Sequence, residues 1–312
     1  MTLLLLSRTF FLPETMPTRL RFFLLATICS LLLAAVGYEA LDRWQRATIF
    51  SIELGEGRWW REPPSRTEIF DINLAGNGTV RAWYLAHADP KAPTVLYLHG
   101  SRWNLNGSVF RIERWLEMGF SVLAIDYRGF GESSPLLPSQ ASATEDAIAA
   151  LHELEQRQPD PSRRYVYGHS LGGAIAVSMA AHTTHPAFAG LILESTFTNI
   201  QDMIPTTGYS AIPGLHRLVT QPFDSVGSIN QVRSPILFLH GTNDQIVPHT
   251  MSDLLFGAAR NRTDTIQQLV KIPGASHSGV SRSGSSYEKA IMNFVGLTSS
   301  STNDAARYQA HR

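Results

Sequence analysis

The sequence has only one cysteine, Cys29, among its 312 residues. A single cysteine cannot form a disulfide within the chain, and Cys29 lies inside an apolar N-terminal run, where no nucleophile is expected. Ile28 precedes it, at a position where a lipidation signal carries a small residue. We therefore expect neither an internal disulfide nor a lipid attached at Cys29.

An excess of charge of either sign is also missing, since 26 Lys and Arg residues are balanced by 26 Asp and Glu residues. Without a basic excess, nucleic acid is not an expected partner. The sequence shows no spacing of His, Cys and Glu typical of a metal site, and no Gly-Lys-Ser/Thr ending of a phosphate-binding loop. Neither a metal ion nor a cofactor is therefore predicted.

The most informative motif is the G-x-S-x-G of Gly168, Ser170 and Gly172. A short apolar strand at residues 164–167 precedes it, and a helix-forming segment of small residues at 171–180 follows it. In this context the serine lies in a sharp turn at the N-terminus of a helix, and the glycines avoid collisions with neighbouring backbone. Ser170 is therefore predicted to be a nucleophile. The plainer alternative is a glycine-rich turn whose serine caps the helix.

A base and an acid follow the serine in the order that such a triad requires. Residues 234–241 read as a buried strand, and Asp244 lies in the loop after it. Residues 267–272 read as another strand, which is followed by His277. In a parallel sheet both loops open at the edge where the serine turn lies. We expect Asp244 to orient His277, and His277 to take the proton of Ser170.

Other carboxylates and histidines compete for these roles. Glu194 ends the apolar strand 190–193 and is the alternative acid, but the loop of Asp244 is the more usual place for it. His249 lies near Asp244 at a predicted helix start, which makes it a weaker candidate base than His277. Asp126 is predicted to tie its own turn together. The remaining histidines of the motif turns are expected to have packing and loop roles: His99, His169 and His240.

Two further motifs complete the pattern. Residues 99–101 (His-Gly-Ser) follow the predicted strand 94–98, and residues 126–133 have the form D-x-R-G-x-G-x-S. Together with the serine turn and the two loops, they resemble the α/β-hydrolase family over residues 67–297. The resemblance implies an α/β fold with a mostly parallel eight-stranded sheet and helices on both faces.

The same resemblance implies an oxyanion hole. Its donors are the backbone N–H groups of Ser101 and of Leu171, the residue after the nucleophile. The chain departs from the family at Arg102 and Trp103, where a small, glycine-containing stretch is common. Fewer residues of the family motif therefore support Ser101 as a donor than support the triad.

The lid is predicted to be minimal. Residues 196–233, where this fold usually inserts a lid, are few and are interrupted by prolines. Their apolar side chains are either the wall of an acyl pocket or plain core, and the sequence does not separate these two interpretations. The residues concerned, together with Trp103, are Phe197, Met203, Ile204, Tyr209, Ile212, Leu215 and Phe223.

The resemblance is closest to small esterase- or lipase-like members with an N-terminal membrane anchor. It implies a serine hydrolase that cleaves a carboxylic ester or thioester of a small molecule or lipid, without a cofactor. One alternative is a peptidase or amidase of the same fold. Another is a non-catalytic binding protein on a hydrolase scaffold, which the presence of all three triad residues argues against.

The N-terminus is predicted to anchor the chain in a membrane. Residues 22–38 form an uncharged apolar run after Arg19 and Arg21, which favours an uncleaved signal anchor over a cleaved signal peptide. The positive-inside rule then keeps residues 1–21 cytoplasmic and places the catalytic domain on the exported side. Secretion after cleavage is the alternative. Translation could also begin at Met16.

The remaining segments are predicted from composition and turn signals. Residues 39–66 read as a polar linker, and residues 298–312 as a disordered tail. Residues 69–74 and 80–86 form a hairpin with an Asn-Gly turn between them. A helix is predicted from about 144 to 156, opened by a capping box at Ser142 and Glu145.

Overall fold

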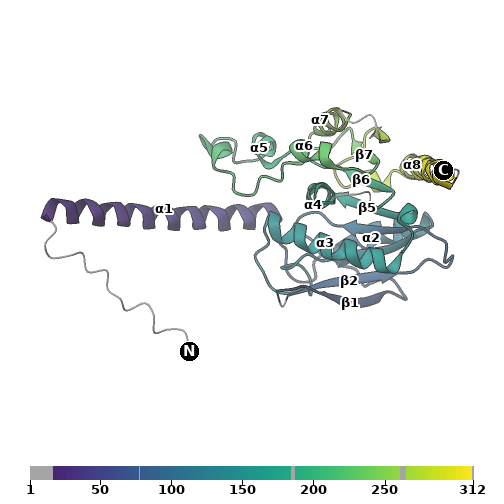
Figure 1. Ribbon diagram of the computed structural model, residues 1–312, viewed down its shortest axis with the longest axis horizontal. Helices are drawn as coiled ribbons and strands as arrows, with labels where there is room; N and C mark the ends of the chain where they lie inside the picture. Colours follow the sequence, from purple (N-terminus) through teal and green to yellow (C-terminus); the bar gives the residue numbers. More distant parts are fainter. Residues whose placement is uncertain (1–16, 77, 184–186, 261–264, 311–312) are drawn as a thin grey trace. The chain divides into compact units, whose positions relative to one another are not determined.

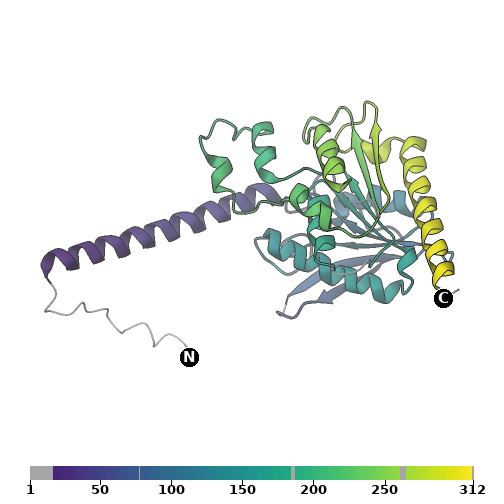
Figure 2. The ribbon, with the colours of Figure 1, turned by 45° about the horizontal axis from the view of Figure 1, so that its top comes forward.

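The computed structural model describes residues 17–76, 78–183, 187–260 and 265–310 (Figures 1 and 2). From residue 300 onward it describes the backbone alone. Contacts divide the chain into an N-terminal unit, residues 1–44, and a catalytic unit, residues 45–312. Residues 1–16, which include the alternative start Met16, lie outside the described residues.

Helix α1, Thr18–Phe50, makes up nearly all of the described part of the N-terminal unit, and its residues from Gln45 onward belong to the catalytic unit. Among the described residues, α1 is the one helix long and apolar enough to cross a membrane, and its apolar window has no buried residues. Thirty-three residues at 1.5 Å each extend about 50 Å, more than the hydrocarbon core of a bilayer. The helix is therefore compatible with a membrane anchor, and equally with a signal sequence.

Helix α1 does not end at Tyr38, although the sequence predicts a linker from residue 39 onward. No Gly or Pro interrupts residues 39–50, and a Glu39–Arg43 pair of 3.8 Å follows the i,i+4 spacing of a helix. The helix continues to Phe50 and ends at Ser51, whose φ of 47° is left-handed. Because the catalytic unit begins at residue 45, much of the predicted linker belongs to that unit.

The catalytic unit is built on one eight-stranded sheet of order β1-β2-β4-β3-β5-β6-β7-β8. Strands β1 and β2 form the predicted hairpin, β2 pairs antiparallel with β4, and all other pairs are parallel. The predicted fold is confirmed. The strands are β1 Glu68–Asn73, β2 Thr79–Leu85, β3 Thr94–Leu98, β4 Ser121–Ile125, β5 Arg164–His169, β6 Gly190–Glu194, β7 Ile236–Gly241 and β8 Gln267–Ile272.

Helices cover both faces of the sheet. The α-helices are α2 Leu105–Glu117, α3 Gln140–Arg157, α4 Leu171–Ala181, α5 Ile200–Met203, α6 Ser225–Ser228, α7 Thr250–Ala259 and α8 Ser285–Ala310. Short 3-10 helices lie at η1 Pro161–Arg163, η2 Ile204–Thr206, η3 Leu215–Leu218, η4 Ile229–Gln231 and η5 Val280–Arg282.

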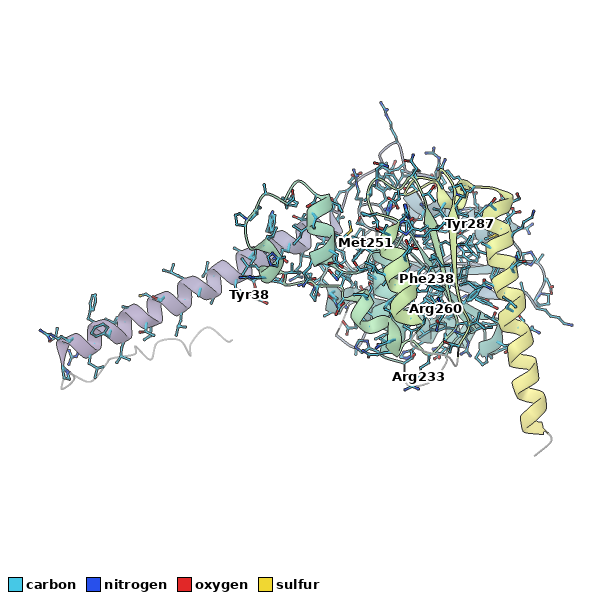
Figure 3. The ribbon with its side chains drawn as sticks, turned by 90° about the horizontal axis from the view of Figure 1, so that it is seen from above. Tyr38, Arg233, Phe238, Met251, Arg260 and Tyr287 are labelled. Atoms are coloured by element: carbon cyan, nitrogen blue, oxygen red, sulfur yellow. The ribbon has the colours of Figure 1, made fainter. Side chains whose placement is uncertain are left out.

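Two hydrophobic clusters fill the space between sheet and helices. Alternate residues of one strand belong to different clusters, as the two-residue period of a strand requires: Leu96 to one, Tyr97 to the other. Phe238 and Met251 belong to the cluster under α3, α4 and α7, and Tyr287 belongs to the cluster under α2 and α8 (Figure 3). The parallel strands β3 to β7 are thus buried on both faces, β8 at the edge is partly buried, and the carboxyl ends of all of them share one edge.

Two predicted element boundaries are wrong. Helix α3 begins at Gln140 with Ser139 as its N-cap, because Ser142 is the last (N3) residue of the capping box and not the first. The hydroxyl of Ser139 accepts from Ser142 N (3.1 Å), and Ser139 N donates to Ser142 Oγ (2.8 Å). At the other end of the chain, α8 continues to Ala310 instead of giving way to a disordered tail. Thr298, the first residue of that predicted tail, is buried and within 2.8 Å of the Tyr165 hydroxyl.

The lid segment between β6 and β7 is short, as predicted. It contains α5, α6 and three 3-10 helices. Its apolar residues divide between core and surface: Phe197 and Phe223 belong to the core cluster, whereas Tyr209 and Ile212 are exposed.

Candidate active site

Ser170 lies in a strained turn between β5 and α4. Its φ of 54° and ψ of −118° place a non-glycine residue in a region that L-residues rarely adopt. The backbone holds it there, since Ser170 N donates to Glu194 O on the neighbouring strand (2.8 Å). Its hydroxyl makes no capping hydrogen bond to α4. The structure therefore has the strand–turn–helix of a nucleophile elbow, and the hydroxyl is not used as a helix cap.

The two flanking glycines allow this turn. A Cβ on Gly168 would lie 2.4 Å from the carbonyl oxygen of Gly172. A Cβ on Gly172 would lie 2.2 Å from the carbonyl oxygen of Leu98, at the end of β3. Real Cβ atoms do not approach a backbone atom so closely, so each position requires glycine.

We expect Gly172→Ala to lower the free energy of unfolding by about 3 kcal/mol, the upper end for overpacking, because the clash is with a central strand. The matched control is Gly257→Ala in α7, where a Cβ has no neighbour within 4 Å. It should stabilise the chain by about 0.5–1 kcal/mol. Thermal unfolding of the full chain in detergent measures both, and equal melting temperatures would contradict this account of the turn.

Asp244 and His277 meet at the same sheet edge, from the loops after β7 and β8. His277 Nδ1 lies 2.8 Å from Asp244 Oδ2. The other carboxylate oxygen accepts from the amides of Ile246 and Val247, both at 2.9 Å. His240 Nε2 is a further partner of Oδ2, at 3.1 Å. Four hydrogen-bond partners thus hold the carboxylate in one orientation.

The environment keeps Asp244 ionised. Burial favours its neutral acid, but hydrogen bonds from His240 and His277 outweigh burial and hold the pKa of this carboxyl well below its usual value. An ionised carboxylate can only accept hydrogen bonds, so His277 Nδ1 carries the proton between them. Nε2 of a neutral His277 is then left as a proton acceptor.

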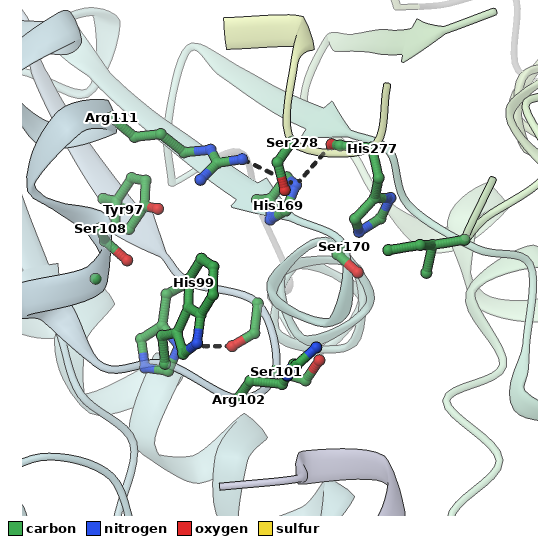
Figure 4. Close-up of a pocket in the computed structure, with 14 residues that line it drawn as sticks. Tyr97, His99, Ser101, Arg102, Ser108, Arg111, His169, Ser170, His277 and Ser278 are labelled. Atoms are coloured by element: carbon green, nitrogen blue, oxygen red, sulfur yellow. Dashed lines mark hydrogen bonds between the residues drawn. The ribbon is translucent and has the colours of Figure 1, made fainter. Parts of the chain in front are cut away.

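Ser170 and His277 line one pocket of about 310 Å³ (Figure 4). None of the fourteen residues in its wall is Asp or Glu, and Trp103 is the only candidate for the acyl-pocket wall named from the sequence that lines it. The wall is built mostly of residues that carry a polar group, yet most of the surface it exposes is apolar. It consists of Tyr97, His99, Gly100, Ser101, Arg102, Trp103, Gly107, Ser108, Arg111, His169, Ser170, Ile246, His277 and Ser278.

The two expected oxyanion donors, Ser101 and Leu171, come from different elements next to the serine turn. Ser101 follows β3 and lines the pocket itself. Leu171 is the first residue of α4, so its amide has no partner within the helix.

The alternative acid, Glu194, has other partners. Its Oε2 accepts from the Tyr167 hydroxyl (2.7 Å), and its Oε1 lies 3.8 Å from Arg111 Nε. Burial raises the pKa of Glu194, and the charge of Arg111 opposes this. The structure brings Asp244, and not Glu194, into hydrogen-bonding distance of His277.

Arg111 is a charged pocket residue that the sequence does not reveal. Its Nη2 lies 3.3 Å from His169 Nε2 (Figure 4). Burial and the charge of Arg111 hold the pKa of His169 well below its usual value, so this ring stays neutral. The one signal in the sequence is its place four residues before Trp115, which puts both side chains on one face of α2.

The other polar candidates have local roles. Asp126 Oδ1 accepts from Leu105 N (2.8 Å) and lies 3.3 Å from His99 Nε2, which ties the β4 turn to the start of α2. His249 is the N-cap residue of α7, and its carbonyl accepts from Lys271. No group of three or more His, Cys, Asp or Glu that could hold a metal ion occurs among the described residues.

Known proteins are similar to this chain in sequence and in fold. A family model described as serine aminopeptidase, S33, matches residues 89–227. Protein bem46 of Schizosaccharomyces pombe is 30% identical over 241 residues, 74% of this chain and 80% of bem46. The lysophosphatidylserine lipase ABHD12 of Danio rerio is 30% identical over 63% of this chain and 55% of its own.

The fold has counterparts among solved structures. The Pyrococcus furiosus esterase Pf2001 matches with a TM-score of 0.64 at 18% identity, over 79% of this chain and 95% of the esterase. At that identity the likeness concerns the fold alone. Sequence and fold agree, and the chain belongs to the α/β-hydrolase family.

Proposed function

We propose that the protein is a serine hydrolase that cleaves a carboxylic ester or thioester through Ser170, His277 and Asp244. The observation that carries the proposal is the combination of a strained, uncapped serine and a carboxylate-bound histidine in one pocket. This is the arrangement by which a weak hydroxyl nucleophile is activated by an adjacent base.

The reaction proceeds in two halves. Ser170 Oγ attacks the acyl carbonyl carbon while His277 Nε2 takes its proton, and Asp244 stabilises the imidazolium. The backbone N–H groups of Ser101 and Leu171 donate to the developing oxyanion. His277 then gives the proton to the leaving alcohol or thiol, and water attacks the acyl-enzyme by the same route.

The pocket favours esters over free peptides. An aminopeptidase needs a carboxylate to bind the substrate's ammonium group, and no Asp or Glu lines this pocket. Similarity to a lysophosphatidylserine lipase supports a lipid ester as substrate, and the match to the serine aminopeptidase family keeps a peptidase as the alternative.

The test is labelling of the full chain in detergent with a fluorophosphonate probe, together with turnover of a series of p-nitrophenyl esters. Both labelling and turnover are expected. A folded chain that is neither labelled nor active would favour the alternative of a non-catalytic binding protein on this scaffold.

We further propose that α1 anchors the chain, with residues 1–21 in the cytoplasm and the catalytic unit on the exported side. Two exposed sites allow a test: Leu54, after the helix, and Thr18, at its start. In a Cys29→Ser background, which removes the chain's own thiol, a membrane-impermeant maleimide should label Leu54→Cys in intact cells and Thr18→Cys only after lysis. The opposite pattern would contradict this orientation, and a chain that lacks residues 22–38 in the medium would indicate secretion.

A further inference from the structure

The segment that follows helix α1 runs along the loop that carries Ser101. We call residues 50–61, which start at the last residue of α1, the strap, and residues 101–106 the oxyanion loop. Both belong to the catalytic unit. The oxyanion loop includes the two residues, Arg102 and Trp103, at which the chain departs from its family.

Backbone hydrogen bonds join the two segments on both sides of one residue. Arg102 N donates to Phe50 O (2.9 Å), and Glu53 N donates to Arg102 O (2.8 Å). Arg102 has a φ of 79°, in the left-handed region that favours glycine. A non-glycine residue keeps such a conformation only where its surroundings hold it. Here the strap supplies those surroundings.

The Glu53 carboxylate adds a second hold on the same loop. Its Oε1 accepts from Arg102 Nε (2.8 Å) and Nη2 (2.5 Å). Its Oε2 accepts from Trp103 Nε1 (3.0 Å). These hydrogen bonds lower the pKa of Glu53, so the carboxylate is ionised at neutral pH. One side chain of the strap therefore binds two consecutive residues of the oxyanion loop.

The contact continues along the loop to its far end. The ring of Trp59 stacks on that of Trp103, with centroids 5.8 Å apart and planes within 17°. Arg61 N donates to Asn106 O (3.1 Å), and Asn106 Nδ2 donates to Arg61 O (2.9 Å). Gly107 makes room for the stack, since a Cβ there would lie 2.7 Å from Trp103 Cβ.

These contacts point to a role in positioning rather than in stability. The side chains of Arg102 and Glu53 are 58% and 37% exposed, and an exposed ion pair contributes little to folding. Stabilisation of an oxyanion, in contrast, is lost on small displacements, because a donor contributes only when its N–H group points at the oxyanion. Ser101, the proposed donor, is bonded directly to the residue that the strap holds.

We propose that Glu53 is a positioning residue, which through Arg102 and Trp103 aims the Ser101 amide at the oxyanion. The inference rests on the proposed function. It gives one side chain, Glu53, an indirect part in catalysis, in a segment that the sequence predicts to be a linker.

The test compares Glu53→Ala with Glu56→Ala in the full chain in detergent. Glu56 lies in the same strap and is exposed. For Glu53→Ala, kcat on a p-nitrophenyl ester should fall roughly 10- to 100-fold with KM unchanged, because a misplacement of about 1 Å has effects of this size. The melting temperature should stay at the wild-type value. Glu56→Ala should match wild type throughout.

A second measurement separates positioning from a general disturbance. A trifluoromethyl ketone forms a tetrahedral adduct whose oxygen occupies the oxyanion hole. Its affinity should fall by the same factor as kcat/KM in Glu53→Ala, and Glu53→Gln, which keeps an acceptor for Arg102, should lose less. Unchanged kcat, or lowered kcat with unchanged ketone affinity, would overturn the proposal alone. A wild-type chain that cleaves no ester would contradict the proposed function, and this inference with it.

Discussion

Replacement of Ser170 with alanine is expected to abolish fluorophosphonate labelling and to lower kcat for ester hydrolysis by a factor on the order of 10⁶. The probe forms a covalent bond to the serine oxygen, so labelling has no route without it. Turnover falls by this large factor because the acyl-enzyme cannot form, and His277 is left with no hydroxyl to activate.

The same variant should remain folded. The hydroxyl of Ser170 makes no capping hydrogen bond, and alanine keeps the same Cβ in the same strained turn. The control is Ser178→Ala, a replacement further along helix α4 and outside the pocket wall. It should be labelled like wild type. If Ser170→Ala were still labelled at the wild-type rate, the nucleophile would lie elsewhere in the chain.

Ser170→Ala also decides between an enzyme and a binding protein. A binding protein on the hydrolase scaffold would keep its biological effect in this variant, because the pocket and its charges are unchanged. An enzyme would lose that effect together with turnover. Complementation of a deletion strain by the variant measures the difference.

The sequence predicts those parts of the site that depend only on local sequence or on the order of the strands. Gly168 and Gly172 mark the turn because their close contacts are with backbone, which no side-chain adjustment can relieve. Asp244 and His277 lie 33 residues apart, yet each follows a strand of the same parallel sheet, and this alone brings them to one edge.

The contacts that the sequence does not predict are long-range and carry no local signal. Glu53 and Arg102 are 49 residues apart, and the polar composition of residues 39–66 reads as a linker whether or not it packs against a loop. Arg111 is a charged residue on the buried face of α2, a place where apolar residues are the rule. Only the fold shows that Glu194 is its buried partner.

Element boundaries failed for a different reason. Ser139 and Ser142 are equally good N-cap residues in isolation, and the choice depends on which of them the preceding chain leaves in an extended conformation. Glu145, which completed the predicted capping box, pairs with Arg128 instead.

Replacement of Asp244 with asparagine should lower kcat by roughly 10⁴-fold, the size of effect expected when the histidine is held in the wrong tautomer. The Asn oxygen can still accept from the amides of Ile246 and Val247. Its NH₂ group then faces His277 Nδ1, which must become an acceptor. The proton of the neutral ring moves to Nε2, the nitrogen that has to accept the proton of Ser170.

Glu194→Gln is the matched comparison, because it neutralises the only other candidate acid with the same change of one oxygen to an NH₂ group. Its Oε2 is bound by Tyr167 and its Oε1 faces Arg111, so its loss should disturb stability more than it disturbs kcat. The acid of the triad is thus the carboxylate whose replacement lowers kcat more, when the two variants are compared as equally folded proteins. If Glu194→Gln lowered kcat more than Asp244→Asn, the carboxylate that orients the base would be Glu194, despite the 2.8 Å contact of Asp244 with His277.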